Sequence, residues 1–595
     1  MTGVHEGCLR MKVKIRIEGK TVEIDRGRSL LEAIRSSGIR VTSPCGGKGT
    51  CGKCLIRLSK KANDGDLTVA EKKLLDREDV EQGYRLACQT FPERDIDVEI
   101  PEESREMTLE LLLKHATINP IVDAALATET RKLSASERTA AGSAIEKGVV
   151  WYDDERVAAI TPEGGRKIAV ALDIGSTTMV AYGFDILEQR IVSAEAMTNP
   201  QRQYGEDIMT RIDFATKSLD QKKLLESVLR KGISELIRRL AAKCGVSTSD
   251  VIRLTFVGNT AMHHFFLGLD VTRLGKVPFQ PEKKTAIEVD GSDIDLEGLE
   301  RAKVNAPPLI AGYVGADLVA VLLATRLTES KAPTAAIDIG TNAEIALAVG
   351  GNVLSCSAAA GPAFEGGNIS FGMRAAEGAI YKVWSESGVL KYETIGKSEP
   401  VGFCGSGLID FVAEGLRLGM IDSAGGFDFD CCGDKLLGKH GNARYILYSN
   451  GRKEVSASQA DIRQLQLGKA AIHTGLEIMM EKKGVKSLDK LLLAGAFGAN
   501  MSIRNGRFIG MLPEIPLNQI IPVGNAAGTG AIQLVSDKSA RKRVLDIVRK
   551  TDHVELSKEK DFQKRFIAAL DFPHQDLSKY PESSKSVKTK VQRRK

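Results

Sequence analysis

The residues best suited to chemistry are four cysteines near the N-terminus. Cys45, Cys51 and Cys54 share one loop with the spacing C-x5-C-x2-C, and Cys88 follows 34 residues after Cys54. Three close thiolates and one distant thiolate supply the four sulfur ligands of a [2Fe–2S] cluster. Four glycines within eight residues of the loop provide positive φ angles and backbone N–H groups that can point at sulfur. A zinc site would favour two C-x2-C pairs, and free structural thiols are the remaining alternative.

A second chemical pattern occurs twice. An apolar run ends at Asp173-Ile174-Gly175-Ser176-Thr177, and another ends 165 residues later at Asp338-Ile339-Gly340-Thr341-Asn342. Glycine permits a tight turn close to a phosphate, and hydroxyl and amide groups can bind its oxygens. One such turn is usually an ordinary strand end, but two facing turns would hold a triphosphate, with Asp173 and Asp338 near Mg²⁺. The candidate phosphate-binding residues are Gly175, Ser176, Thr177, Gly340, Thr341 and Asn342.

A third glycine-rich pattern lies further along the chain. The apolar run Leu491–Ala494 leads into Gly495-Ala496-Phe497-Gly498, and a second turn contains Gly524-Asn525. We therefore add Gly495, Gly498, Gly524 and Asn525 to the candidate nucleotide-binding residues. No Walker-type G-x4-G-K-[ST] motif is present in the sequence.

The elements that must position the cysteines form a unit of about 100 residues. Residues 11–24 alternate apolar and charged side chains around a turn, which predicts a hairpin. Residues 29–37 predict a short helix that ends at Gly38, and residues 96–100 predict a final strand. With the cysteine spacing, residues 11–101 resemble ferredoxins of the vertebrate type. This resemblance implies a β-grasp fold.

The two Asp-Ile-Gly turns each follow a buried strand, at 168–174 and 335–339, and each precedes another β-rich run. Helical periodicity follows at 221–240 and 459–482. This repetition predicts a duplicated α/β domain. Together with the third glycine pattern, residues 168–535 resemble the acetate kinase, sugar kinase, heat-shock 70 and actin (ASKHA) superfamily, through its phosphate 1, phosphate 2 and adenosine motifs.

We therefore expect a multidomain protein. It comprises a [2Fe–2S] ferredoxin domain over 11–101, a linker and small middle domain over 102–166, an ASKHA ATPase domain over 167–540, and a helical extension with a basic disordered tail over 541–595.

Composition excludes several other classes. Apolar residues make up 43 % and charged residues 27 % of 595, as in ordinary globular proteins. No apolar run suggests a membrane helix, and the first ten residues lack an apolar core typical of export signals. The net charge is +6, but residues 581–595 alone carry six Lys or Arg against one Glu. We therefore expect a cytoplasmic protein that binds neither membrane nor nucleic acid.

A ferredoxin domain joined to an ASKHA domain resembles the reductive activators of corrinoid proteins. No cysteine follows Cys432, which fits the members with an N-terminal [2Fe–2S] cluster. Further segments that fit the family are 199–207, 257–264, 314–317, 361–366 and 402–407. The resemblance implies ATP-dependent transfer of an electron from the cluster to inactive Co(II), which regenerates Co(I) for methyl transfer. It implies the cofactors ATP and Mg²⁺, and catalytic roles for Asp173 and Asp338 in positioning Mg²⁺ and water.

The same resemblance implies the partners. These are the corrinoid protein of a methyltransferase system, a low-potential electron donor and a second copy of the chain in a homodimer. Three other functions stay open: an iron–sulfur activator of another radical or low-potential enzyme, an ASKHA kinase with a redox domain, and a scaffold that binds ATP without coupling. We interpret His263-His264 and Cys431-Cys432 as packing residues, and the hydroxyls of Ser357 and Ser406 as hydrogen-bonded loop groups.

Overall fold

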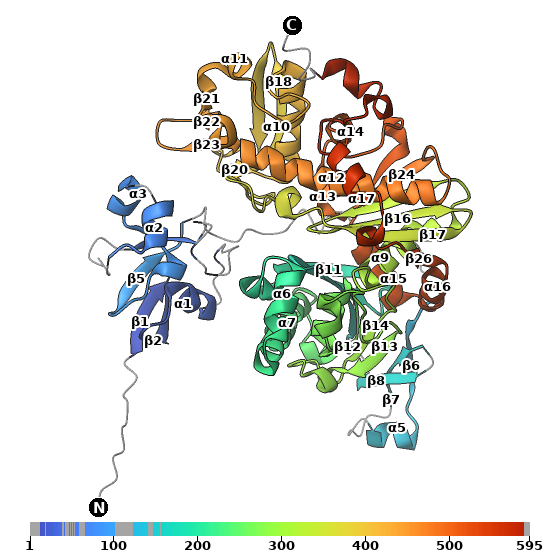
Figure 1. Cartoon of the computed structure of the whole chain (residues 1–595). Helices are drawn as coiled ribbons and strands as arrows, with labels where there is room; N and C mark the ends of the chain where they lie inside the picture. The colour runs from blue at the N-terminus through green and yellow to red at the C-terminus, as the bar shows by residue number, and fades with distance from the viewer. Residues whose placement is uncertain are drawn as a thin grey trace, which may run out of the picture. The chain divides into compact units, whose positions relative to one another are not determined.

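The computed structural model describes residues 12–17, 19–37, 41, 47, 49, 52, 54–58, 66–75, 77–101, 123–140, 147–154, 156–162 and 164–587. Two predicted cluster ligands, Cys45 and Cys51, and the basic end of the predicted tail lie outside these residues. The chain forms two compact units, Met1–Thr108 with Gln201–Arg211, and Leu109–Pro200 with Ile212–Lys595. Figure 1 colours both by residue number.

The N-terminal unit is built on a five-stranded sheet with the order β2-β1-β5-β3-β4. Strand β1 alternates exposed and buried residues, as its sequence predicts, and it pairs antiparallel with β2 and parallel with β5. The predicted hairpin, helix and final strand are all present, and the mixed sheet confirms the β-grasp fold. Its elements are β1 (Lys12–Ile17), β2 (Lys20–Asp25), α1 (Leu30–Ser36), β3 (Leu55–Leu58), α2 (Val69–Leu74), α3 (Arg77–Glu81), β4 (Tyr84–Leu86) and β5 (Ile96–Glu99).

A buried ion pair joins α2 to β4 in this unit. Glu71 is fully buried, and its carboxylate accepts hydrogen bonds from Arg85 at 2.8 and 3.1 Å and from the Leu86 amide at 3.1 Å. The same carboxylate closes a capping box with Thr68 at the start of α2. Burial alone would raise the pKa of Glu71. The hydrogen bonds to its carboxylate lower the pKa by a larger amount, so the pKa lies below its ordinary value. The pair fixes the strand that leads to Cys88.

The second unit contains two six-stranded sheets with related topology, seen in Figure 1 with the helices that cover them. The first sheet has the order β11-β10-β9-β12-β14-β13 and the second β25-β24-β15-β16-β17-β26. In each, the Asp-Ile-Gly strand lies between an antiparallel pair of strands on one side and two parallel strands on the other. The predicted duplication is therefore confirmed, with β13 and β26 added at opposite edges.

The first repeat consists of β9 (Ile168–Ile174), β10 (Thr178–Asp185), β11 (Arg190–Thr198), α7 (Leu219–Lys243), β12 (Val251–Gly258), α8 (Thr260–Leu267), β13 (Ile287–Asp290), β14 (Lys303–Ala306) and α9 (Ala316–Thr325). Helix α6 (Ile208–Thr216) crosses the division between the two units. The second repeat consists of β15 (Thr334–Ile339), β16 (Ala343–Val349), β17 (Asn352–Ala358), α12 (Gln459–Lys482), β24 (Lys490–Ala494), α13 (Gly495–Asn500), α14 (Ile503–Phe508), β25 (Ile520–Gly524) and α15 (Ala526–Ser536).

Helices α9 and α15 follow the last common strand of each repeat and pack against each other (Figure 1). Their closest approach is at Gly530, where an added Cβ would lie only 2.2 Å from the carbonyl oxygen of Ala320. Any side chain at Gly530 would therefore push the helices apart. The contact brings the N-termini of both helices toward the ends of the two Asp-Ile-Gly strands.

Smaller elements complete the second unit. Two three-stranded sheets and two helices are inserted in the second repeat: β18 (Ala379–Glu386), β19 (Val389–Thr394), β20 (Gly402–Phe403), α10 (Gly405–Leu418), α11 (Phe429–Cys432), β21 (Leu436–Leu437), β22 (Arg444–Ser449) and β23 (Glu454–Ser458). The C-terminal segment contributes α16 (Lys538–Arg549), β26 (Thr551–His553) and α17 (Phe562–Ala568). Strand β26 joins the large sheet beside β17, so this segment is more than a helical extension.

A separate antiparallel sheet precedes the first repeat. Its strands are β6 (Leu126–Lys132), β7 (Lys147–Asp153) and β8 (Arg156–Pro162), and helix α5 (Ala135–Ala140) lies between β6 and β7 in the chain. The backbone amide of Ala125 donates to the Ser536 carbonyl at 2.8 Å, and the backbone amide of Lys538 donates to the Asp123 carbonyl at 2.9 Å. These two hydrogen bonds hold this sheet against the junction of α15 and α16. The boundary that the sequence predicts at 166 stays a prediction. Among the helices of the described residues, none is both long and apolar enough to cross a bilayer.

We predict that Glu71→Gln lowers the free energy of unfolding of the N-terminal unit by about 3–5 kcal/mol, because it leaves the Arg85 charge buried without its partner. Urea unfolding of the full chain, followed by hydrogen exchange in β4, measures the change. Because the folded pKa of Glu71 is lowered, its stabilisation is present above the unfolded pKa and is lost as pH falls. The control is Glu32→Gln, whose ion pair with Arg28 is exposed and is expected to contribute less than about 1 kcal/mol. Equal effects of the two substitutions would contradict the prediction.

Candidate functional site

Four carboxylates from both repeats meet at one place in the second unit. Asp173 is the second-last residue of β9 and Asp338 is the second-last residue of β15, as the repeated motif predicts. Glu344 lies opposite Asp338 in the β15–β16 register, so their side chains share one face of the sheet. Asp317 lies in the first turn of α9. Asp173 interacts electrostatically with Asp338 and Asp317, and Glu344 interacts with the same two acids.

Burial and mutual repulsion make these carboxylates hard to ionise together. Burial, followed by the neighbouring acids, raises the pKa of Asp173 to about 7 and that of Asp338 to about 7. Burial raises the pKa of Asp317 to about 6, and the pKa of Glu344 also lies well above its ordinary value. No lysine or arginine of the described residues is among the groups that shift the pKa values of these four carboxyls. Such a set of oxygen ligands without a cationic side chain suits a hard divalent cation.

The two Asp-Ile-Gly turns face each other. In the first, the Gly175 amide donates to the Thr178 carbonyl at 2.9 Å, and in the second the Gly340 amide donates to the Asn342 carbonyl at 3.0 Å. The hydroxyls of Thr177 and Thr341 lie 3.4 Å apart, which joins the two repeats directly. Ser176 and Asn342 are half-buried within the same turns. The structure thus brings together the two loops that the sequence places 165 residues apart.

The third glycine pattern also reaches this site. Gly495 has a φ of +82°, and a Cβ there would lie 2.5 Å from Oδ1 of Asp338, so only glycine fits. Asn525 caps α15, because its Oδ1 accepts a hydrogen bond from the Gly528 amide at 2.9 Å. The Asn525 side chain also forms a hydrogen bond with the carboxyl of Asp173. Gly524, with a φ of +68°, ends β25 just before this cap. Gly498 lies within α13 in ordinary contact with Leu493 of the preceding strand.

The cysteine region of the N-terminal unit has the features that a cluster requires. Cys54 and Cys88 are buried, at 1 % and 5 % exposure, and the Ala87 amide donates to the Cys54 carbonyl at 2.8 Å. The loop glycines within the described residues, Gly47, Gly49 and Gly52, have φ angles of +92°, +71° and +68°. A Cβ at Gly47 would lie 3.8 Å from that of Cys88, which places the loop beside the distant cysteine. Buried thiols beside a glycine-rich loop fit a [2Fe–2S] cluster, which would supply one-electron chemistry when bound.

Comparisons with known proteins match the same regions. Residues 13–93 match the 2Fe-2S iron-sulfur cluster binding domain. Residues 168–330 match the RACo middle region, and residues 332–584 match the C-terminal domain of RACo, the ASKHA domain. A solved structure, titled as the reductive activator for corrinoid, iron-sulfur protein, is 30 % identical with a TM-score of 0.71 and covers 96 % of this chain and 100 % of its own. The chain belongs to this family of reductive activators.

Two curated relatives of this activator family also align with the chain. The corrinoid activation enzyme RamQ of Eubacterium limosum is 29 % identical over 94 % of this chain and 98 % of its own length. The reductase of the Co(II) methylated amine-specific corrinoid protein of Methanosarcina barkeri is 26 % identical over 68 % of this chain and 76 % of its own. The alignment with RamQ therefore extends over both units.

Two residues of the carboxylate site were not identified from the sequence. Asp317 ends one of the segments that fit the family, without a role of its own. Glu344 lies two residues after the second Asp-Ile-Gly turn, and this proximity was the available signal. Asp317 could be found only by knowing that α9 and α15 pack together. Ser357 lies in β17 and not in the expected loop, and its hydroxyl is 3.4 Å from Oε1 of Glu344, so this serine also belongs to the carboxylate site.

The remaining candidates occupy structural positions. Both ring nitrogens of His264 form hydrogen bonds: Nδ1 lies 2.8 Å from the Thr260 carbonyl, and Nε2 lies 3.0 Å from the Glu282 amide. His263 is fully buried beside it. Burial lowers the pKa of both histidines, which keeps them neutral. The Ser406 hydroxyl donates to the Tyr381 carbonyl at 2.9 Å. These contacts agree with packing roles.

A second group of metal-ligand side chains lies between α12 and the C-terminal segment. Single ligand atoms of His473, Glu477 and His574 all lie within 4.8 Å of one another. The Asp576 amide donates to Nδ1 of His574 at 2.9 Å, so in the neutral ring the proton is on Nε2. That leaves His574 no lone pair for a metal on this side. Contacts among these three side chains explain the arrangement better than a bound metal does, and they hold the C-terminal segment against α12.

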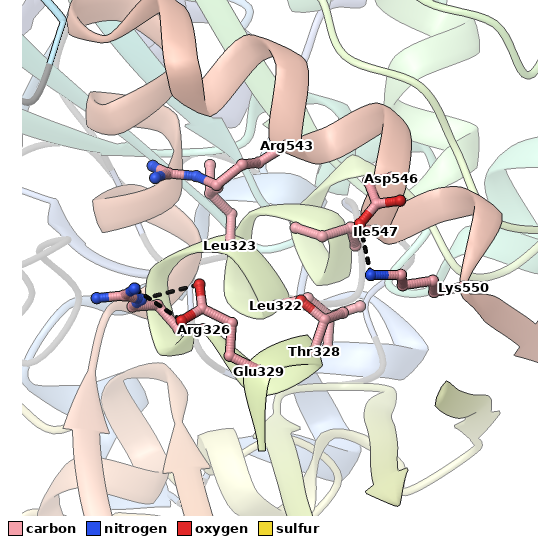
Figure 2. Close-up of a pocket in the computed structure, with 9 residues that line it drawn as sticks. All are labelled: Leu322, Leu323, Arg326, Thr328, Glu329, Arg543, Asp546, Ile547 and Lys550. Atoms are coloured by element: carbon pink, nitrogen blue, oxygen red, sulfur yellow. Dashed lines mark hydrogen bonds and ion pairs between the residues drawn. The ribbon is translucent and has the colours of Figure 1, made fainter. Parts of the chain in front are cut away.

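A surface pocket of about 100 Å³ lies where the end of α9 meets α16 (Figure 2). Two ion pairs line it, Arg326 with Glu329 at 2.7 Å and Lys550 with Asp546 at 2.7 Å. These two cations are already paired, and Arg543, which also lines the pocket, lies 3.7 Å from Asp537, so the pocket has little unpaired charge to offer an anion. It also lies at the opposite end of α9 from Asp317.

We predict that Mg²⁺-nucleotide binding releases protons near neutral pH. At pH 6 the carboxyls with a pKa of about 6 to 7 hold protons, and at pH 8 they are ionised. Affinity for Mg²⁺-ATP should therefore rise from pH 6 to pH 8. Calorimetry in buffers of different ionisation enthalpy counts the released protons, and Glu344→Gln should release fewer. A pH-independent affinity without proton release would show that these groups do not hold the cation.

Proposed function

We propose that the chain is an ATP-dependent reductive activator of a corrinoid protein. It delivers one electron to the inactive Co(II) form and so regenerates Co(I). The observation that carries this proposal is the carboxylate site between two facing Asp-Ile-Gly turns, on the same chain as the buried Cys54 and Cys88. The printed names of RamQ and of the amine-specific reductase describe such an activity for those proteins.

The nucleotide would bind between the two repeats. Backbone amides of the two turns, with Thr177 and Thr341, would hold phosphate oxygens, and Asp173 and Asp338 would position Mg²⁺ and water. The cation, when bound, offsets the negative charge that the phosphates and carboxylates share. Gly495 leaves room beside Asp338, and Asn525 orients Asp173 through its side-chain hydrogen bond. Ser176, Gly175, Gly340, Asn342, Gly498 and Gly524 complete the proposed nucleotide-binding set.

Nucleotide binding would drive electron transfer by favouring one arrangement of the two repeats. Besides the Thr177–Thr341 contact, Arg374 donates to the Thr198 hydroxyl at 2.9 Å across the same junction. A ligand shifts a conformational equilibrium only by binding one state more tightly. Each tenfold preference corresponds to about 59 mV for a one-electron step. ATP held by both repeats would favour the closed arrangement and thereby the productive complex with the corrinoid protein.

Cys45, Cys51, Cys54 and Cys88 would hold the [2Fe–2S] cluster. Cys54 directly precedes β3 and Cys88 follows β4, and the antiparallel register that pairs Leu55 with Leu86 places both cysteines at the same end of the strand pair. The Glu71–Arg85 pair therefore stabilises the framework of two proposed ligands. A low-potential electron donor would reduce the cluster before each activation. We place this chemistry in the cytoplasm.

We predict that Asp338→Asn abolishes ATP-dependent formation of Co(I), because it removes one carboxylate that would hold the cation. The measurement is the cobalt absorption spectrum of a Co(II) corrinoid protein, incubated anaerobically with the chain and a low-potential reductant, with and without Mg²⁺-ATP. Reduction of the cluster by the same reductant should be unchanged.

The matched control is Asp546→Asn, which removes a surface carboxylate paired with Lys550. It should leave cobalt reduction intact. Equal Co(I) formation by the wild-type chain with and without ATP would overturn the coupled mechanism. Phosphorylation of a sugar or acyl substrate would instead support the kinase alternative.

We further propose that the chain acts as a homodimer. Sedimentation equilibrium of the purified chain should give about twice the monomer mass of 64.3 kDa. A monomer over the whole concentration range would exclude this assembly.

A further inference from the structure

The short helix α2 lies directly on the cysteine loop. A Cβ added at Gly49 would lie 3.0 Å from Cβ of Ala70, and one at Gly52 would lie 3.8 Å from Cβ of Leu74. Ala70 and Leu74 are four residues apart and so share one side of the helix. Since Gly49 and Gly52 flank the predicted ligand Cys51, this inner side of α2 contacts the loop of the proposed cluster.

The outer side of α2 is exposed and carries two lysines. Val69, Lys72 and Lys73 have the spacing i, i+3, i+4 and therefore share one face. Val69 is 86 % exposed, which is unusual for an apolar side chain on a small domain, and both lysines are exposed. Neither lysine has an ion-pair partner within the described part of the chain. Arg85, in contrast, is held by Glu71.

A second exposed apolar side chain follows a residue that contacts the same loop. The side chain of Gln89 approaches Gly49, since a Cβ at that glycine would lie 2.8 Å from Cδ of Gln89. Phe91 lies two residues after Gln89, just beyond the short 3-10 helix η1 (Ala87–Gln89). Phe91 is 50 % exposed. Two exposed apolar side chains, Val69 and Phe91, thus belong to segments that contact the cysteine loop.

We propose that Val69, Lys72, Lys73 and Phe91, here called the α2 face, bind the electron-donor protein, an acidic, low-potential iron–sulfur protein. The inference rests on the proposed function and names the class of its donor. Apolar contacts next to the cluster with a basic rim match an acidic partner, and charge complementarity raises the rate of encounter. A small surface of this kind suits a donor that binds weakly and leaves after one electron.

One electron is all that passes between the donor and this chain at the α2 face. The donor's reduced iron–sulfur centre loses one electron, and the cluster of this chain gains it. No bond forms or breaks, and no proton moves. The corrinoid complex, in contrast, must respond to nucleotide, which binds in the other unit.

The test compares two charge reversals in the full, cluster-loaded chain. Lys72→Glu with Lys73→Glu alters the α2 face, and Lys12→Glu with Lys20→Glu alters the β1–β2 hairpin at the opposite edge of the sheet from β3 and β4. The probe is a small acidic ferredoxin, reduced photochemically and mixed with the chain by stopped flow. The α2-face variant should accept electrons about tenfold or more slowly at low salt, with a weaker salt dependence, and the hairpin variant should resemble the wild type.

Two further measurements separate docking from other effects. Binding of the oxidised ferredoxin, measured by calorimetry, should weaken only in the α2-face variant. Reduction by a small uncharged mediator should be equal in all three proteins, which shows an intact cluster. Phe91→Ala should weaken ferredoxin binding without altering its salt dependence.

Unchanged electron acceptance and ferredoxin binding in the α2-face variant would overturn the proposal. Retained ferredoxin binding combined with weakened binding of the corrinoid protein would assign the face to the corrinoid protein instead, and would equally overturn it. Failure of the proposed function looks different, because a chain that accepts electrons through this face but never reduces cobalt would leave the docking result intact.

Discussion

The repulsion among four half-buried carboxylates is the interaction on which the candidate nucleotide site depends. Asp173 and Asp317 come from the first repeat, and Asp338 and Glu344 come from the second. Each repeat alone would hold two acids, but the contact of the repeats at Thr177 and Thr341 brings all four together. Since the described neighbours include no cationic side chain to offset this charge, the site favours protons or a divalent cation. Closure of the repeats is therefore linked to what the site binds.

The duplicated topology explains why such a site exists. In each repeat, the chain leaves the central strand through an Asp-Ile-Gly turn, and a helix follows the last parallel strand. Packing of α9 on α15, which requires Gly530, brings the two helix starts together. Asp317 and Asn525 consequently occupy related places at the starts of these helices, and both reach the central carboxylates. One repeat supplies a charge there and the other an amide.

The sequence could predict what depends on local pattern. The cysteine loop, the two Asp-Ile-Gly turns and the duplicated strands each have a short signature, and the described loop glycines adopt the positive φ angles that the cluster interpretation requires. Contacts between distant segments were not predictable in this way. Glu71 and Arg85 resemble many other acid and base pairs until their burial is known. Strand β26 pairs with β17 nearly 200 residues away, although no local pattern marks it as part of that sheet.

The carboxylate repulsion also gives nucleotide a physical means of controlling electron delivery. Under the proposed function, bringing the repeats together without a cation would crowd four carboxylates that repel one another, so closure would be opposed. Mg²⁺-ATP held as proposed would reverse this preference, because the cation and the turn amides would stabilise negative charge only when both turns are close. Hydrolysis divides the phosphates and weakens that stabilisation. A corrinoid protein that fits only the closed arrangement would thus be held while ATP is present and released afterwards, which makes electron transfer directional.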